Sequence, residues 1–238
     1  MPVLWYCPGN GRCFWVNLPA AVFFDLDGTL ADTETAWRKA EEELCAQAGV
    51  APSNDLLEHL VGVDMDSAAR LLIDYTGLKW SVERINAYLL DRVNASLEQG
   101  VVWQPGMREL LTFLNTSQVK CGLVTSSPLS MARVVIDHLP KGSFDVIVTG
   151  DDVDSPKPHP EPYVRAAGLV GAQARDCIAL EDSPTGVKSA MSAGCITVAI
   201  PHMVQVPAVK GLSRIPSARY LTAPVMEALM SGSTINNI

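Results

Sequence analysis

Five short apolar runs, rich in β-branched residues, constrain what this chain can fold into more than any other feature. They are AAVFFDL (20–26), KCGLVTS (120–126), FDVIVTG (144–150), CIALED (177–182) and CITVAIP (195–201). Their apolar residues are continuous rather than alternating, which is typical of strands buried on both faces. From residue 105 onward a helical pattern follows a proline in each connecting segment, at Pro105, Pro128, Pro160 and Pro184. Alternating strands and helices predict an α/β fold, with a doubly wound, Rossmann-like parallel sheet and right-handed crossovers.

The segment between the first two runs has a different pattern. Residues 33–100 hold no comparable strand-like run, and helical patterns cover 33–49, 53–61, 66–76 and 81–100. This predicts a helical bundle inserted into a core made of residues 20–32 and 101–238. At the end of the core, we expect a short strand near Tyr220 and a terminal helix from Pro224.

Residues 1–19 form an aromatic extension interrupted by Pro8, Gly9 and Gly11, and they do not resemble a signal peptide. We expect this extension to be poorly ordered. The alternative is a small flap that packs its aromatic side chains, Trp5, Phe14 and Trp15, on the domain.

Composition excludes several classes of partner. The 238 residues are 48% apolar with a net charge of −8, which suits one large domain or a domain with an insert. An acidic chain is a poor match for nucleic acid or for an anionic membrane surface, but a local site can still bind a small anion. No run approaches the roughly 18 apolar residues that span a bilayer. Nothing in the sequence separates a monomer from a dimer.

The six cysteines are scattered without a CxxC pair. This usage predicts buried free thiols in a reducing compartment, and hence a cytoplasmic protein. Cys7 and Cys13 have an alternative, because they could form a bridge or bind a metal.

Polar side chains gather where the predicted strands end. They are Asp25 and Asp27 after the first run, Thr125 and Ser126 in the second, Lys157 beyond the third, and Glu181 and Asp182 at the end of the fourth. In open parallel sheets ligands bind at this carboxyl edge. One carboxylate can act as a nucleophile, a second can act as a general acid and base, and further carboxylates can hold Mg²⁺. Hydroxyls and a lysine suit transferring phosphoryl oxygens.

DLDGTLAD, VTSS, the lysine of SPKPHPEPY, and LEDSPTG resemble the four motifs of the haloacid dehalogenase-like hydrolases. The inserted bundle resembles the helical cap of that superfamily's β-phosphoglucomutase-like branch of phosphatases and mutases. The resemblance covers about residues 20–200.

The resemblance implies a role for each matching residue. Asp25 would be the nucleophile that becomes an aspartyl phosphate, and Asp27 would be the general acid and base. Lys157 would bridge Asp25 and the phosphoryl group. That group would be bound by Ser126 with Thr125, and Mg²⁺ would be held by Asp25, Asp27 through its main-chain carbonyl, Asp182 and Glu181. Gly28 would allow the tight turn that follows.

The resemblance leaves alternatives within the superfamily. Its dehalogenases lack the second aspartate, so Asp27 argues against that activity. Its mutases carry a cap histidine where this chain has Trp37 and a phosphate-gripping arginine where it has Met65, although Arg70 lies about one turn further on. These three residues, with 61–64, Glu34 and Arg38, are the candidates for substrate specificity.

We therefore expect a Mg²⁺-dependent phosphatase that hydrolyses a small phosphomonoester, such as a sugar phosphate, through an aspartyl phosphate. A β-phosphoglucomutase-type phosphosugar mutase is the alternative. A non-catalytic binding protein on this fold is a third possibility, and it is disfavoured because every catalytic motif is intact.

Overall fold

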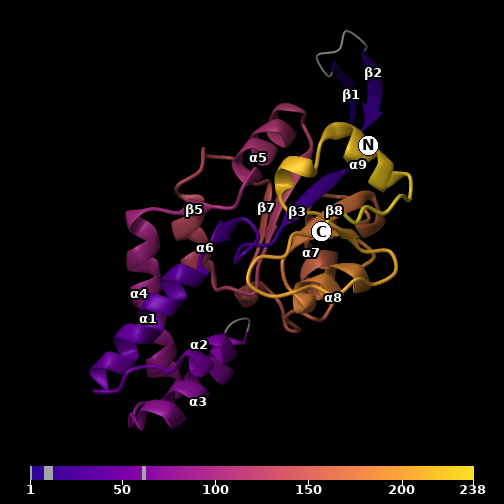
Figure 1. The fold of residues 1–238 in the computed structure, drawn as a ribbon. Coiled ribbons are helices and arrows are strands. Elements are labelled where there is room, and N and C mark those ends of the chain that lie inside the picture. The colour runs from indigo at the N-terminus through magenta and orange to yellow at the C-terminus, as the bar shows by residue number, and fades with distance from the viewer. Residues whose placement is uncertain (1, 8–12, 61–62) are drawn as a thin grey trace.

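A computed structural model describes residues 2–7, 13–60 and 63–238 (Figure 1). Its centre is a six-stranded parallel sheet in the order β10-β9-β8-β3-β6-β7. The strands are β3 (Ala21–Phe24), β6 (Lys120–Val124), β7 (Val146–Val148), β8 (Cys177–Glu181), β9 (Ile196–Ala199) and β10 (Ser213–Arg214). All five apolar runs are strands, as predicted. Because the chain order runs outward in both directions from β3, the switch point of the sheet lies at β3.

Helices cover both faces of this sheet. Val22 and Phe24 point to the face covered by α5 (Met107–Thr116), α6 (Leu129–Ile136) and α9 (Ala223–Met230). Ala21 and Phe23 point to the face covered by α7 (Glu161–Leu169) and α8 (Pro184–Ser192). The strand therefore needs apolar side chains at every position, and each large one contributes about 1.5–3 kcal/mol by burial.

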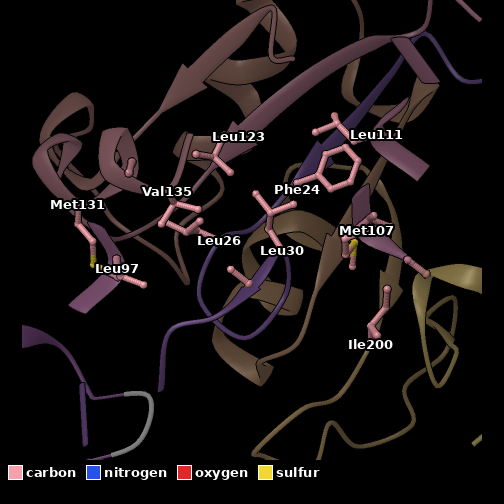
Figure 2. Close-up of a cluster of buried hydrophobic side chains, with 14 of the residues drawn as sticks. Phe24, Leu26, Leu30, Leu97, Met107, Leu111, Leu123, Met131, Val135 and Ile200 are labelled. Atoms are coloured by element: carbon pink, nitrogen blue, oxygen red, sulfur yellow. The ribbon is translucent and has the colours of Figure 1, made fainter. Parts of the chain in front are cut away.

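The larger cluster joins the sheet to its helices and to the inserted bundle. Figure 2 shows side chains from β3, β6, α4, α5, α6 and nearby loops that belong to it: Phe24, Leu26, Leu30, Leu97, Met107, Leu111, Leu123, Met131, Val135 and Ile200. The loop that leaves β3 is thus anchored by Leu26 and Leu30, which are both fully buried.

In the described part of the chain, the four helices between residues 33 and 100 stand apart from the sheet in Figure 1. They are α1 (Glu34–Gln47), α2 (Asn54–Leu60), α3 (Met65–Thr76) and α4 (Val82–Gln99). Side chains cap the first turns of α3 and α4: Asp64 and Ser81 accept hydrogen bonds from the backbone N–H groups of Ser67 and Arg84. A two-stranded ribbon of β4 (Ala31–Asp32) and β5 (Val102–Trp103) joins this bundle to the core.

All four helices expected in this segment are present, whereas the domain limits of 33 and 100 stay a prediction. The candidate residues at 61 and 62 lie outside the described part of the chain.

The N-terminal extension forms an antiparallel hairpin of β1 (Val3–Tyr6) and β2 (Phe14–Asn17). The indole rings of Trp5 and Trp15 lie 4.9 Å apart on its outer face, and they are 52% and 64% exposed. Val16, on the opposite face, is buried, and the backbone N–H of Asn17 donates to Glu227 of α9 over 2.9 Å. Because strand residues alternate between faces, burial of Val16 leaves the tryptophans outside.

Cys7 and Cys13 form a disulfide, so the expectation that all six cysteines are free thiols is wrong for this pair. The other four cysteines are free and buried.

The tail differs from expectation at one place. Residues Ala218–Tyr220 form a short 3-10 helix, and the last strand lies earlier, at Ser213–Arg214. Pro216 cannot donate to a strand ladder, so the pairing of β10 with β9 ends before it. The terminal helix around Pro224 is present as α9. Two other 3-10 helices occur at Gly150–Asp152 and Ala174–Asp176. Within the described ranges, every helix is too short or too polar to cross a membrane.

Candidate active site

Asp25 lies where β3 leaves the sheet. Its backbone N–H still donates to Leu180 of β8 over 3.1 Å, so sheet pairing extends one residue beyond the strand. The chain then turns, and Gly28 adopts a φ of +78°, a conformation that side chains rarely tolerate. A Cβ added at Gly28 would also overlap the carboxylate of Asp182. Strand geometry therefore ends before Asp27, and the two aspartates take different partners.

Lys157 provides the buried positive charge of the site. It lies between β7 and α7, and its Nζ is 2.6 Å from Asp25 Oδ1, 2.6 Å from Glu181 Oε1 and 2.9 Å from the carbonyl oxygen of Val124. Its side chain is only 5% exposed. Burial favours the neutral amine, but the two carboxylates outweigh it and hold the pKa of Lys157 above its usual value. The ammonium is therefore fixed against Asp25.

The carboxylate of Glu181 is engaged in hydrogen bonds within the protein, one of them with Lys157. The Tyr163 hydroxyl donates to the same Glu181 oxygen over 2.5 Å, and Ser183 lies 3.4 Å from the other oxygen. Burial raises the pKa of Tyr163, which keeps it protonated as a donor. A side chain at Gly186 would overlap the Glu181 carboxylate, so α8 approaches it closely.

Sequence reasoning missed Tyr163. The available signal was its place six residues after Lys157, at the start of a helix predicted from Pro160.

Asp27 is held by hydroxyl groups. The Thr33 hydroxyl donates to Asp27 Oδ1 over 2.6 Å, and those of Ser127 and Thr125 donate to Oδ2 over 2.5 Å and 3.3 Å. The predicted residue Ser126 is exposed, and within the described ranges its side chain has no hydrogen-bond partner. The structure brings Thr125, Ser127 and Thr33 to Asp27, a contact that sequence reasoning assigned to none of them; the predicted role of Thr125 and Ser126 in binding the phosphoryl group stays a prediction. Three hydroxyls in a row in VTSS were the signal for Ser127.

The buried carboxylates carry more negative charge than Lys157 balances. Asp25, Glu181 and Asp182 each place an oxygen within 4.8 Å of the others. Burial raises the pKa of Asp25 to about 7, with Lys157 opposing the rise and Glu181 adding to it. Burial, followed by repulsion from Asp25, raises the pKa of Asp182 to about 9. Three oxygen donors with a shortage of positive charge fit a hard divalent cation.

The three predicted specificity residues lie in the inserted bundle. Trp37 is half-buried on α1 and packs against the large apolar cluster. Met65 begins α3, and Arg70 is exposed further along that helix. Among the described residues, none of the three makes a hydrogen bond or ion pair with Asp25, Asp27 or Lys157.

A parallel sheet whose carboxyl edge gathers buried carboxylates, hydroxyls and one lysine is typical of an enzyme active site. Residues 22–200 match the family model described as haloacid dehalogenase-like hydrolase. The chain belongs to this family.

Similar proteins and solved structures agree with this family assignment. The chain is 31% identical to a phosphorylated carbohydrates phosphatase of Thermotoga maritima, over 73% of this chain and 81% of that protein. It is 32% identical to hexitol phosphatase A of Escherichia coli, over 74% and 81% of the two chains. The crystal structure of a family IA hydrolase from Entamoeba histolytica superposes with a TM-score of 0.77 at 25% identity, covering 89% of this chain and 99% of that one.

Proposed function

We propose that the protein is a Mg²⁺-dependent phosphatase that hydrolyses a small phosphomonoester, such as a sugar phosphate, through an aspartyl phosphate on Asp25. The observation that carries this proposal is the buried contact of Lys157 with Asp25, beside Asp182, at the switch point of the sheet. Relatives named as phosphatases of phosphorylated carbohydrates and of hexitols support the substrate class.

The metal would be held by the carboxylates of Asp25 and Asp182 and by the main-chain carbonyl of Asp27. When bound, it would neutralise charge on the carboxylates and on the phosphoryl oxygens. Glu181 is engaged by Lys157 and Tyr163, so we assign it the positioning of Lys157 rather than a place among the main ligands.

The reaction would proceed in two steps. A carboxylate oxygen of Asp25 attacks phosphorus, and the bond from phosphorus to the ester oxygen breaks as Asp27 donates a proton to the departing alcohol. Asp27 then takes a proton from water, which attacks phosphorus and releases phosphate from Asp25. The hydroxyls of Thr125 and Ser127 each carry one proton, which they donate to Asp27 in this structure; to stabilise phosphoryl oxygens they would donate that proton to the substrate instead.

A phosphosugar mutase is the alternative within the same chemistry. It needs a cation in the bundle to hold the second phosphate of a bisphosphate, and Met65 stands at the matching position. Assays with β-glucose 1-phosphate and a bisphosphate primer separate the two activities, because a mutase yields an isomerised sugar phosphate and a phosphatase yields free phosphate.

The test of the nucleophile is Asp25→Asn, assayed with p-nitrophenyl phosphate. We expect the rate to fall about 10⁴-fold or more, because an amide cannot form the covalent intermediate. Asp137→Asn, an exposed site at the end of α6, is the matched control and should keep the wild-type rate. EDTA should stop the wild-type reaction and Mg²⁺ should restore it. An Asp25→Asn variant that hydrolyses the ester at a normal rate contradicts the assignment.

A further inference from the structure

An open cavity of about 640 Å³ lies beside β5 and the start of α5 (Figure 1). Its walls come from residues 103–106, from one side of α5 and from Arg219 in the 3-10 helix Ala218–Tyr220. This volume falls within the range of about 300–1,000 Å³ that is usual for small-molecule sites. Among the described residues, those that line it include neither Lys157 nor any carboxylate of the candidate active site. The cavity is therefore separate from that site.

Two arginines supply positive charge to this cavity. Arg108 lies in the first turn of α5, and its guanidinium carbon is 5.7 Å from the centre of the Trp103 ring. Arg219 reaches the same cavity because its segment packs closely on Gly106, where an added Cβ would lie 2.6 Å from the Arg219 backbone nitrogen. Both arginines are exposed, and within the described ranges neither guanidinium group makes an ion pair or a hydrogen bond. In a chain of net charge −8, two arginines that share a cavity without acidic partners are available to an anion.

Gln104 adds a buried donor to the cavity wall. Its side-chain amide nitrogen is buried and has no hydrogen-bond partner among the described residues. The backbone N–H of Gln104 donates to the carbonyl oxygen of Leu30 over 3.1 Å, which holds the residue in place. A buried donor without an acceptor costs free energy, and an acceptor supplied by a ligand would recover it.

The start of α5 has the same preference as the arginines and the amide. Its N-cap residue is Gly106, which has no side chain to accept hydrogen bonds from the first turn. The backbone N–H of Met107 donates to the carbonyl oxygen of Gln104, and the next two N–H groups have no acceptor within the helix. These groups and the helix dipole favour a negative charge. Donors from three segments of the chain thus surround one cavity.

The cavity also has an apolar side and a small net charge. Trp103 and Phe113 are half-buried and pack against the large apolar cluster, so their rings are held in place. Glu109 is the acidic side chain among the lining residues, and with two arginines it leaves a net charge of +1. That charge suits a ligand with one negative charge. A guanidinium group binds a carboxylate through two parallel hydrogen bonds, and aromatic rings favour a flat apolar body.

We propose that this cavity is a second binding site, which takes a small organic carboxylate that carries an apolar ring. The carboxylate accepts hydrogen bonds from Arg108, Arg219 and Gln104, and the ring packs on Trp103 and Phe113. Because Trp103 pairs with Ala31 of β4, the ligand contacts the ribbon that joins the bundle to the core. This inference goes beyond the proposed phosphatase activity and does not depend on it.

The test uses phenylacetate as the probe and follows the indole N–H signal of Trp103 in ¹H–¹⁵N spectra of the full chain. Trp103→Phe identifies this signal among those of the five tryptophans. We expect phenylacetate to shift it in a titration that saturates. Phenylacetamide has nearly the same shape without the charge, and acetate has the charge without the ring. Each should bind about tenfold or more weakly than phenylacetate.

Three variants locate the site. Arg108→Gln and Arg219→Gln should each weaken phenylacetate binding about tenfold, because each removes a charged donor from an exposed position. Gln104→Met should weaken it about threefold or more, because it removes the buried amide. Arg175→Gln, the same change at an exposed arginine outside the cavity, should keep the wild-type affinity.

The comparison of ligands needs only wild-type protein, so it decides the matter even where a variant folds poorly. A Trp103 signal that does not shift to saturation overturns the site. So does equal affinity for phenylacetate and phenylacetamide, because the cavity would then not select a charge. An affinity that survives both Arg108→Gln and Arg219→Gln would place the ligand elsewhere and overturn the proposal as well.

Discussion

Replacing Lys157 by methionine tests the centre of the site, because it removes the ammonium and keeps most of the side-chain stem. At 2.6 Å and an effective dielectric constant of about 20, each of its two attractions is about 6 kcal/mol before desolvation is counted. Desolvation offsets much of this, and removing one partner of a buried pair typically costs about 3–5 kcal/mol. We expect the free energy of unfolding to fall by about that amount. We also expect kcat to fall about 10²-fold or more.

The loss of stability should depend on pH. The pKa of Asp25 is about 7 with Lys157 present, and Lys157 is the main group that lowers it. A carboxyl whose pKa is raised on folding stabilises the protein below its unfolded pKa, and that stability is lost as pH rises through the folded pKa. Without the ammonium the folded pKa rises further. The deficit should therefore be larger at pH 8 than at pH 5.5.

The assay is urea unfolding of metal-free protein at both pH values, followed by p-nitrophenyl phosphate kinetics with Mg²⁺. Lys120→Met is the matched control, since Lys120 also lies 2.6 Å from a carboxylate, that of Asp145, but is 56% exposed. Its loss should be much smaller, because solvent screens exposed pairs. Equal losses for the two variants, or a Lys157 deficit that does not change with pH, would refute the reasoning.

Two further predictions concern the acidic cluster. The pKa values of Asp25 and Asp182 are raised to about 7 and about 9, so metal-free protein should lose stability as the pH rises from 5 to 9. Adding Mg²⁺ should restore that stability. A Tm in EDTA that rises over this pH range would contradict the pKa shifts. Gly28→Ala should lower the free energy of unfolding by more than about 1–2 kcal/mol, which is the cost of placing a residue with a side chain in a left-handed conformation. It should also weaken stabilisation by Mg²⁺, because the added Cβ displaces the carboxylate of Asp182. Gly142→Ala, with a φ of +80° and open space around it, measures the conformational cost alone, and an equal loss there would remove the steric argument.

Much of this site follows from the sequence, because parallel strands bring their carboxyl ends to one edge whatever the loops do. On that ground the sequence predicts that Asp25, Lys157 and Asp182 gather at one edge; in the structure Lys157 contacts Asp25, and oxygens of Asp25 and Asp182 lie within 4.8 Å of each other. The prediction needed only which runs were strands, and a continuous apolar run identifies a strand buried on both faces.

The hydrogen-bond partners of Asp27 could not be predicted from the sequence in the same way. Whether Ser126 or Ser127 faces the aspartate depends on the turn that follows β6, and no periodicity describes a single turn. Tyr163 raises a related difficulty, since its hydroxyl reaches Glu181 only because α7 packs closely on the sheet. How closely a helix approaches the sheet depends on the packed core, so the sequence indicated a helix at this place without indicating that Tyr163 contacts Glu181.

The polar groups at the centre of the site already have hydrogen-bond partners within the protein. In the core, Glu181 is bonded to Lys157 and Tyr163, and Asp27 is bonded to three hydroxyls. A satisfied group is already in its working position before substrate arrives, whereas an unsatisfied one gains free energy only when a suitable donor binds. Changes to these core groups should therefore affect the hydrolysis of every phosphomonoester alike.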